Sequence, residues 1–531
     1  YMVVSFDGSN ATVYVDSTSL DTRSFSINTV AGTGFIGSRI APTEYFNGTI
    51  DEVRISSTAR SAGWIATEYN NQNSPSTFSS FSAQASTPLT AANNHTISAG
   101  TVNLNGANLT VSGTFSNSAT LQLKGDETVS TPTLNTGSTV EYTATSGTRN
   151  IQNWTYTNTT LKINGTGGTF TLPAAITASA INIAAGTLDV TTNNYGITNS
   201  GNWTNSGTFT QRSGTVTLNG TAQAIAGSTT FYNLTKTVAA ADTLTFTAGT
   251  TQTIATGGKL VLRGASGQLL TLASSTTSAF TIAFADTTAK YVVDYVSVSY
   301  STASGLGILA LNSTNGGNNT LWTFQTTSGT LRYWIATSAG NWNDTANWST
   351  TSGGAGGSSV PVSTSDAIFD GSANGNSTVN ATINVKGLYL AGYSGTFSQG
   401  ANALTIGADN YSQGTGTFTG GSGTIDVNGT FALSGGTFTS TSGTLSVSST
   451  FTISGTPTFT HNSGTVQFDT SNATITPSTV SFNHVSFTSA ATKTIANSNT
   501  VTVAGNLTLT NGYINQTTIP ATGSVSVTGA T

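Results

Sequence analysis

The acidic side chains of this chain of 531 residues are the first candidates for chemistry, because paired carboxylates are what glycoside hydrolysis requires. Glutamates occur at Glu44, Glu52, Glu68, Glu127 and Glu141 only, so a pair further along the chain would have to be two aspartates. After Arg332 the aspartates are Asp344, Asp366, Asp370, Asp409, Asp426 and Asp469, and the basic residues are Lys386 and Lys493.

Polysaccharide-cleaving enzymes need clustered carboxylates with a basic side chain nearby to offset the negative charge that develops during the reaction. The spacing of these acids and lysines shows no such cluster. The sequence therefore predicts a protein that is not an enzyme.

A calcium ion is the one cofactor that the acids suggest. Asp366 and Asp370 flank the apolar triplet Ala367-Ile368-Phe369, and two acids so placed could share the ion. The alternative is that they cap turns at the entrance to a repeat module. Cysteine is absent and the three histidines lie far apart in sequence, so no other metal site or cofactor is expected.

The densest aromatic group comprises Tyr333, Trp334, Trp342 and Trp348. Exposed aromatic rings can stack on sugars, so these four residues are candidates for ligand binding. The alternative is a hydrophobic cap over an open end of the fold, because such an end must be covered. Trp322 and Phe324 would cap a preceding module for the same reason.

The elements that position these side chains are expected to be strands. Only 7% of residues are charged, whereas Gly, Ser, Thr and Asn dominate, a composition that disfavours long helices and favours strands and turns. The net charge of -5 leaves no basic stripe, so nucleic acid is not expected as a partner. The longest apolar runs are too short for insertion into a membrane.

A repeat of 20 residues gives the architecture. Gly416-Thr417-Phe418, Gly423-Thr424-Ile425 and Gly429-Thr430-Phe431 are followed 20 residues later by Gly436-Thr437-Phe438, Gly443-Thr444-Leu445 and Ser449-Thr450-Phe451. A third round aligns Phe418 with Phe438 and Phe459, Ile425 with Leu445 and Val466, and Val427 with Val447 and Phe468. Three short strands with glycine corners per period are typical of a parallel β-helix, in which equivalent apolar residues stack.

A weaker copy of this pattern precedes it. Ser213 to Asn233 echoes Ser463 to His484, so residues 82–326 and 327–531 are predicted to be two right-handed parallel β-helix, or β-solenoid, modules, the second incomplete at its C-terminus. Rungs about 4.8 Å apart would make each module a rod of roughly 50 Å, or about 100 Å together. A string of β-sandwiches is the rival architecture, although sandwiches do not demand the 20-residue step.

The first segment, residues 1–81, alternates in period two around an Asp7-Gly8 turn. The run from Tyr45 to Ile55, followed by Trp64-Ile65 and Glu68 to Gln72, resembles the C-terminal end of a laminin-G-like, concanavalin A-like lectin domain. The resemblance implies a partial jelly-roll β-sandwich without the family's first strands. It also implies that Asp51 and Glu52 lie on a structural strand from Ile50 to Ile55, with Arg54 as an internal partner for an acid.

Two further motifs resemble the repeat modules of large secreted bacterial surface proteins. Asn312 to Phe324 is similar to the motif that ends such modules, and Arg332 to Trp348 is similar to the motif that opens them. The resemblance places the module boundary between Gln325 and Thr330.

These patterns together predict an all-β extracellular or cell-surface protein, secreted by a prokaryote. We expect an adhesin stalk or a subunit of a surface fibre or filament that associates end to end with copies of itself or with the rest of a longer parent chain. One alternative is a carbohydrate-binding adhesin with surface glycans as partners. A polysaccharide lyase or hydrolase is a third hypothesis.

Overall fold

The structure is a computed structural model that describes residues 1–26, 36–38, 45–73, 88–469, 473–490, 492–510, 513–516 and 524–527. The chain divides into two compact units, Tyr1–Thr87 and Pro88–Thr531, which we describe separately. The protein is all-β, with 3% helix, and a β-solenoid of about 20 turns follows the N-terminal segment. The predicted fold class is therefore confirmed.

Unit one contains a three-stranded antiparallel sheet of β1 (Met2–Phe6), β2 (Asn10–Val15) and β3 (Thr18–Ser24). The predicted turn at Asp7-Gly8 forms, with the Asp7 carboxylate accepting the backbone N–H groups of Ser9 and Asn10 at 2.8 and 2.7 Å. The alternation of apolar residues therefore predicted the first strands correctly.

Two features of unit one differ from the sequence-based prediction. The helix α1 (Ala62–Asn73) was not expected, and it begins where the Ser61 hydroxyl accepts the N–H of Trp64 at 3.2 Å. Residues 50–55 do not form the predicted strand, and the Ile55 side chain is 92% exposed. A strand requires a hydrogen-bonded neighbour, and none of the described residues pairs with this segment.

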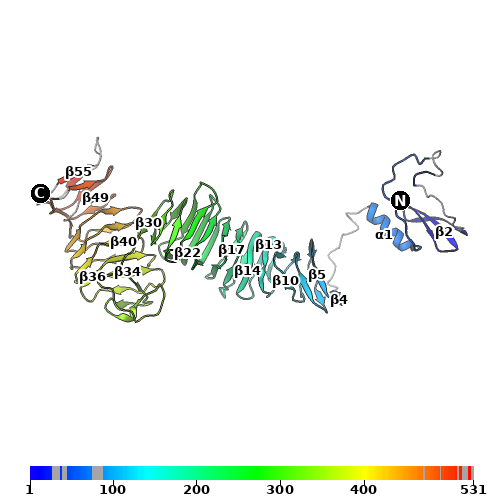
Figure 1. Ribbon diagram of the computed structural model, residues 1–531, viewed down its shortest axis with the longest axis horizontal. Helices are drawn as coiled ribbons and strands as arrows, with labels where there is room; N and C mark the ends of the chain where they lie inside the picture. Colours follow the sequence, from blue (N-terminus) through cyan, green and yellow to red (C-terminus); the bar gives the residue numbers. More distant parts are fainter. Residues whose placement is uncertain are drawn as a thin grey trace. The chain divides into compact units, whose positions relative to one another are not determined.

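The first solenoid in unit two runs from β4 to β30, and its strands pair in parallel from rung to rung (Figure 1). Its strands are β4 (Leu89–Ala91), β5 (His95–Ile97), β6 (Thr101–Asn103), β7 (Leu109–Val111), β8 (Phe115–Asn117), β9 (Thr120–Leu123), β10 (Thr133–Leu134), β11 (Ser138–Tyr142), β12 (Thr148–Asn150), β13 (Tyr156–Thr171), β14 (Ile176–Asp189), β15 (Ile197–Asn199), β16 (Trp203–Asn205), β17 (Thr208–Thr210), β18 (Thr215–Leu218), β19 (Gln223–Ala226), β20 (Thr229–Thr237), β21 (Asp242–Phe246), β22 (Thr251–Arg263), β23 (Leu270–Ser274), β24 (Phe280–Phe284), β25 (Lys290–Asp294), β26 (Val296–Val298), β27 (Ser301–Ser304), β28 (Ile308–Leu311), β29 (Thr314–Asn315) and β30 (Trp322–Gln325).

The second solenoid has three faces. The first face contains β31 (Thr330–Trp334), β34 (Ser365–Asp370), β37 (Gly387–Ala391), β40 (Tyr411–Gln413), β43 (Phe431–Leu433), β46 (Phe451–Ile453), β49 (Ala473–Thr476), β52 (Thr492–Ile495) and β55 (Tyr513–Gln516), with β33 (Trp348–Ser349) antiparallel to β31. The second contains β32 (Gly340–Asn341), β35 (Ser377–Thr378), β38 (Thr396–Ser398), β41 (Thr417–Thr419), β44 (Thr437–Thr439), β47 (Thr458–Thr460), β50 (Ser481–Phe482), β53 (Thr500–Val503) and β56 (Ser524–Val527). The third contains β36 (Ile383–Val385), β39 (Leu404–Ile406), β42 (Ile425–Val427), β45 (Thr444–Val447), β48 (Thr465–Phe468), β51 (His484–Phe487) and β54 (Leu507–Leu509).

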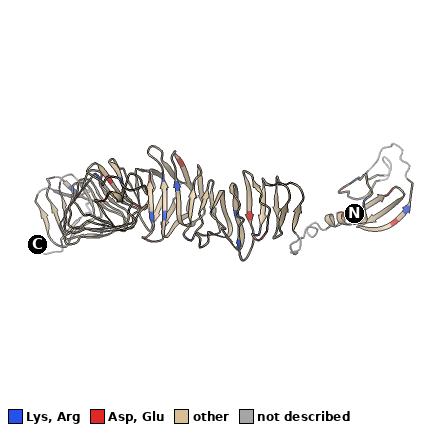
Figure 2. Cartoon of the chain, turned by 90° about the horizontal axis from the view of Figure 1, so that it is seen from below, with Lys and Arg blue, Asp and Glu red and all other residues tan. Residues whose placement is uncertain are grey.

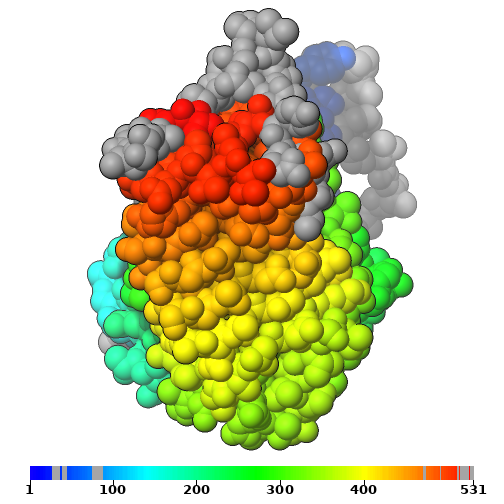
Figure 3. All heavy atoms as spheres, turned by 90° about the vertical axis from the view of Figure 1, so that its left-hand side faces the viewer, coloured from blue at the N-terminus to red at the C-terminus, as the bar shows by residue number. Residues whose placement is uncertain are grey.

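The register of these strands matches the 20-residue repeat. Phe418 pairs with Phe438 and Phe438 with Phe459, and the other two predicted columns are paired in the same way. The aromatic rings of Phe418 and Phe438 stack at 4.7 Å between centroids. Gly416 and Gly436 stand at the corners with φ of +72°, a conformation that other residues resist. Successive rungs appear as bands of colour in Figure 3.

Each solenoid has its own apolar interior. One cluster of buried residues extends from Ile97 to Ala310, and a second extends from Trp334 to Val503. Lysine, arginine, aspartate and glutamate are sparse and scattered along both solenoids (Figure 2). Ser and Thr instead occupy the alternating outward positions, where they need only meet water.

A third apolar cluster joins the two solenoids. It comprises Leu309, Leu311, Tyr333, Ile368, Tyr389 and Ala391, which lie on β28, β31, β34 and β37. These strands send their alternate residues, such as Ile308 and Leu388, into the two separate interiors. The solenoids therefore contact each other through their outer faces. The estimate of about 100 Å for both modules assumed that they lie end to end, so it does not apply to this arrangement.

Candidate functional site

The aromatic group proposed for ligand binding lies in the interior. Trp334, Trp342 and Trp348 are 0%, 3% and 0% exposed, and the rings of Trp342 and Trp348 meet at 4.7 Å. Two of the three indole N–H groups are hydrogen-bonded, since Trp334 donates to the Gly375 carbonyl at 2.8 Å and Trp348 to the Trp342 carbonyl at 2.7 Å. These side chains cover the first rung of the second solenoid and present no ring face to a sugar.

Tyr333 does not belong to this cap. Its side chain points from β31 to the opposite side, is 5% exposed, and packs in the cluster between the solenoids. Burial raises its pKa well above the ordinary value. All four aromatic candidates are therefore inaccessible to a ligand in this structure. For the three tryptophans this arrangement agrees with the alternative hypothesis, a hydrophobic cap over an open end of the fold.

The two aspartates suggested as calcium ligands do not meet. Asp366 and Asp370 stand at the two ends of the extended strand β34, where a rise of about 3.3 Å per residue separates their Cα atoms by about 13 Å. Asp370 accepts hydrogen bonds from the backbone N–H and the hydroxyl of Ser372. One ion cannot bridge carboxylates at that separation, and the described residues hold no group of three or more acids or histidines suited to a metal ion.

The structure instead brings together a polar group that the sequence analysis missed, which we call the Ser328 cluster. It comprises Ser328, Asp366, Lys386 and Asp409. Asp409 accepts the N–H of Ser328 at 2.8 Å and its hydroxyl at 2.7 Å, and the Lys386 ammonium lies 3.5 Å from the same carboxylate. Asp366 accepts the backbone N–H groups of Ser328 at 3.1 Å and of Gly329 at 2.6 Å.

The two carboxylates of the Ser328 cluster have opposite electrostatic environments. Burial raises the pKa of Asp366 to about 6, the neighbouring Asp409 adds to that effect, and the N–H bonds from Gly329 and Ser328 oppose it. Burial also acts on Asp409, but the hydrogen bonds from Ser328 and the charge of Lys386 outweigh it and hold the Asp409 pKa below its ordinary value. Asp366 is thus the more readily protonated of the two.

Polysaccharide cleavage would need carboxylates with a basic side chain nearby, and the Ser328 cluster contains two carboxylates and a lysine. The order of residues along the chain did not reveal this group. The repeat could have shown it, since Asp366 and Lys386 are 20 residues apart and Asp409 follows by one further rung. Both carboxylates, however, are bound by the backbone of residues 328–329, which connect the two solenoids. In this arrangement the cluster holds the connection in place.

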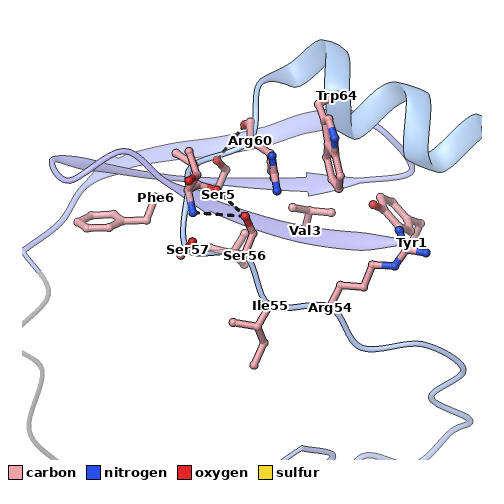
Figure 4. A pocket seen from close by; sticks show the side chains of 13 residues that line it. Tyr1, Val3, Ser5, Phe6, Arg54, Ile55, Ser56, Ser57, Arg60 and Trp64 are labelled. Carbon is pink, nitrogen blue, oxygen red and sulfur yellow. Dashed lines mark hydrogen bonds between the residues drawn. The ribbon is translucent and has the colours of Figure 1, made fainter. Parts of the chain in front are cut away.

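Unit one carries a pocket of about 680 Å³ (Figure 4). It is lined by Tyr1, Val3, Val4, Ser5, Phe6, Arg54, Ile55, Ser56, Ser57, Thr58, Ala59, Arg60 and Trp64. The Arg60 guanidinium lies over the Trp64 ring at 4.8 Å, and the Trp64 side chain is 37% exposed. An exposed indole beside a cation and several hydroxyl groups is suited to a polar ligand with an apolar face.

The resemblance to a lectin-like domain implied that Arg54 has an acidic partner. Arg54 forms ion pairs with Glu52 at 2.8 Å and with Glu68 of α1 at 2.5 Å. Asp51 and Glu52 lie in residues 50–55, which do not form the strand predicted to carry them. Arg54 and Glu52 therefore hold this segment against α1, since Arg54 pairs with Glu68 and Gln72 donates to Glu52 at 3.3 Å.

Residues 1–66 match the family model described as the concanavalin A-like lectin/glucanases superfamily. The comparison with curated proteins and the comparison with solved structures found no match to the chain. The N-terminal segment is thus concanavalin A-like and is followed by a long β-solenoid region, as the resemblance implied. The combination indicates a structural or adhesin-like protein.

Proposed function

We propose that this protein is an extracellular stalk or fibre component in which the solenoids of unit two form the shaft and unit one supplies an adhesive head. The observation that carries the proposal is the parallel ladder of rungs through unit two, built on stacked apolar columns. Concanavalin A-like domains of the laminin-G type are typical of extracellular proteins. The helix in the described residues is too short and too polar to cross a membrane.

We further propose that shafts associate end to end with copies of the same chain. The first rung consists of β4, β5 and β6, which pair with β7, β8 and β9 on one edge only within the described residues. Residues 88–103 contain no Asp, Glu, Lys or Arg. Charged side chains are a common means of blocking strand addition at an edge, so nothing in the described part of the chain blocks this rung against another strand.

The hydrogen bonds of β5 allow a selective test. His95 donates its N–H to Thr114 and the Ile97 carbonyl accepts from Ser118, so the N–H and carbonyl of Thr96 point to the open edge. A Thr96→Pro variant should keep every ladder bond to β8 and reduce concentration-dependent assembly measured by light scattering. A control substitution at the same exposed position, Thr96→Val, should assemble like the wild type. Equal assembly of the proline variant would contradict association through this rung.

Carbohydrate binding is the second candidate function, and the Arg60 and Trp64 pair in the pocket of unit one favours it. Aromatic rings stack on the apolar faces of sugars. A Trp64→Ala variant should abolish binding to a glycan array, whereas Trp322→Ala, on the solenoid, should leave it unchanged. A wild-type protein that binds no glycan on the array would remove this candidate.

We propose that the protein has no catalytic activity on polysaccharides, because the backbone of the connecting segment engages the carboxylates of the Ser328 cluster. Incubation with acidic glycans in the presence of calcium should release no oligosaccharide. Release that is lost in an Asp409→Asn variant would overturn this proposal.

A further inference from the structure

We propose that the two solenoids form a rigid elbow, whose angle is set by a glycine slot on the second solenoid that receives Tyr291 of the first. The slot comprises Gly371, Gly392 and Gly414, which follow directly after β34, β37 and β40. The inference goes beyond the proposed function and does not depend on end-to-end association. It predicts that the connection between the solenoids is a fixed joint and not a flexible linker.

Tyr291 makes a close contact between the two bodies. It is fully buried, and its carbonyl accepts the N–H of Gly371 at 2.9 Å. Its hydroxyl accepts the N–H of Leu309 at 2.9 Å and donates to the Gly307 carbonyl at 3.2 Å. The tyrosine therefore fixes its own solenoid and the neighbouring one at the same point.

Glycine is required in the slot because a side chain there would meet Tyr291. A Cβ atom at Gly392 would overlap the Tyr291 carbonyl, one at Gly371 would lie 2.5 Å from it, and one at Gly414 would lie 2.6 Å from the Tyr291 hydroxyl. In the following rungs, the residues directly after β43 and β46 are Ser434 and Ser454. Glycine thus occupies this column only in the three rungs that contact Tyr291.

A groove between the bodies lies beside the slot. Its volume is about 560 Å³, and its walls include residues 305–307 and Leu321 of the first solenoid and residues 434–437 of the second. The groove is lined largely by glycine, serine and threonine.

A buried ion pair lies beside the same contact. The Arg263 guanidinium binds both carboxylate oxygens of Asp294, at 2.7 and 2.8 Å. Burial raises the pKa of Asp294, and the charge of Asp370 across the joint adds to this effect. Both residues lie on paired strands of the first solenoid, so the ion pair orders the side of that solenoid that faces Asp370 and does not itself bridge the two bodies.

The connecting segment is held from both sides. The N–H and hydroxyl of Thr327 donate to the Asn312 side chain of the first solenoid at 3.0 and 2.9 Å. The next residues, Ser328 and Gly329, donate to Asp409 and Asp366 of the second solenoid. A segment whose successive residues are bonded to both bodies cannot act as a free hinge.

The chain has no cysteine, so two introduced cysteines can carry spin labels for distance measurements by electron paramagnetic resonance. Exposed Thr277 of the first solenoid and Ser422 of the second are suitable positions. In the full-length Thr277→Cys, Ser422→Cys protein we expect one narrow distance distribution. Gly392→Ala should broaden it at least twofold and raise the rate of proteolysis within residues 326–329 at least tenfold.

Gly400→Ala is the matched control, because Gly400 also has a positive φ, of +64° against +91° for Gly392, but has open space around its Cβ position. It should leave the distribution narrow. Leu309→Ala tests the joint from the first solenoid without altering either interior, and it should broaden the distribution even if Gly392→Ala fails to fold. A broad distribution in the parent protein, or narrow ones in both joint variants, would overturn the rigid elbow.

Discussion

Replacement of Trp334 by alanine is expected to lower the free energy of unfolding of the second solenoid by about 3–5 kcal/mol. Trp334 is fully buried and contacts Trp348 and Phe369 at ring distances of 5.3 and 5.4 Å. Its loss would leave a cavity at the first rung and remove one of the two donors to the Gly375 carbonyl, which would keep the Tyr393 hydroxyl. Chemical denaturation followed by circular dichroism of the strands measures the change.

Trp64→Ala provides the control, because that residue belongs to unit one and is partly exposed. Its unfolding curve for the solenoids should match that of the wild type. If Trp334→Ala kept wild-type stability and lost glycan binding, the result would contradict the role of Trp334 as a hydrophobic cap. The indole would then have to contact a ligand and not pack in the core.

Replacement of Asp366 by asparagine is expected to stabilise unit two at pH 7.5 by about 2 kcal/mol. Burial raises the pKa of the Asp366 carboxyl group from 3.8 to about 6, and the free energy that corresponds to this shift is reduced here because solvent screens part of the effect. The folded state binds this proton more tightly than the unfolded state does. The wild type should therefore lose stability as the pH rises from about 4 through 6, because the buried carboxylate must then be ionised. An amide has the same shape and can still accept the N–H groups of Ser328 and Gly329.

Thermal unfolding midpoints between pH 5.0 and 7.5 test this expectation. The Asp366→Asn variant should show a smaller fall over that range than the wild type, although Asp294, whose pKa is also raised, should retain part of it. Asp426→Asn, on an outward position of the same solenoid, is the control and should follow the wild type. A pH dependence that is unchanged in Asp366→Asn would show that the Asp366 carboxylate is not the group responsible.

The repeat was the part of the fold that the sequence predicted best. The Phe418, Phe438 and Phe459 column is in the predicted register because a solenoid places equivalent residues one rung apart and gives each a similar environment. The burial of Trp334, Trp342 and Trp348 also followed from a local requirement, namely that the first rung must be covered. The register of the phenylalanine column and the burial of the tryptophans both depend on contacts within one rung or with the next rung.

Features that depend on contacts across several rungs were not predicted. The Ser328 cluster needs residues 328, 366, 386 and 409 to meet, and the glycine slot needs residue 291 to meet residues 371, 392 and 414. No local pattern marks such encounters, although the 20-residue period would have aligned Asp366 with Lys386. Helix α1 was missed because composition argues against helices on average and says little about one stretch of 12 residues.

The two acids proposed for calcium illustrate a related limit. Their separation of four residues would have brought them together on a turn or a helix, but β34 is extended and places them at opposite ends. The strand from Ile50 to Ile55 failed for a complementary reason, since alternating side chains fit a strand but cannot supply its hydrogen-bonded neighbour. In both cases the prediction rested on the residue types in one segment, whereas the outcome depended on the backbone conformation or on a neighbouring strand.

Cryo-electron microscopy of the assembled protein is the most direct test of the central claim, that this is a structural shaft whose rungs continue from one chain to the next. The account predicts fibres in which the β4 to β6 edge of one chain adjoins a strand of another chain at the rung spacing of about 4.8 Å. Isolated single chains at every concentration, with that edge exposed to solvent, would contradict it.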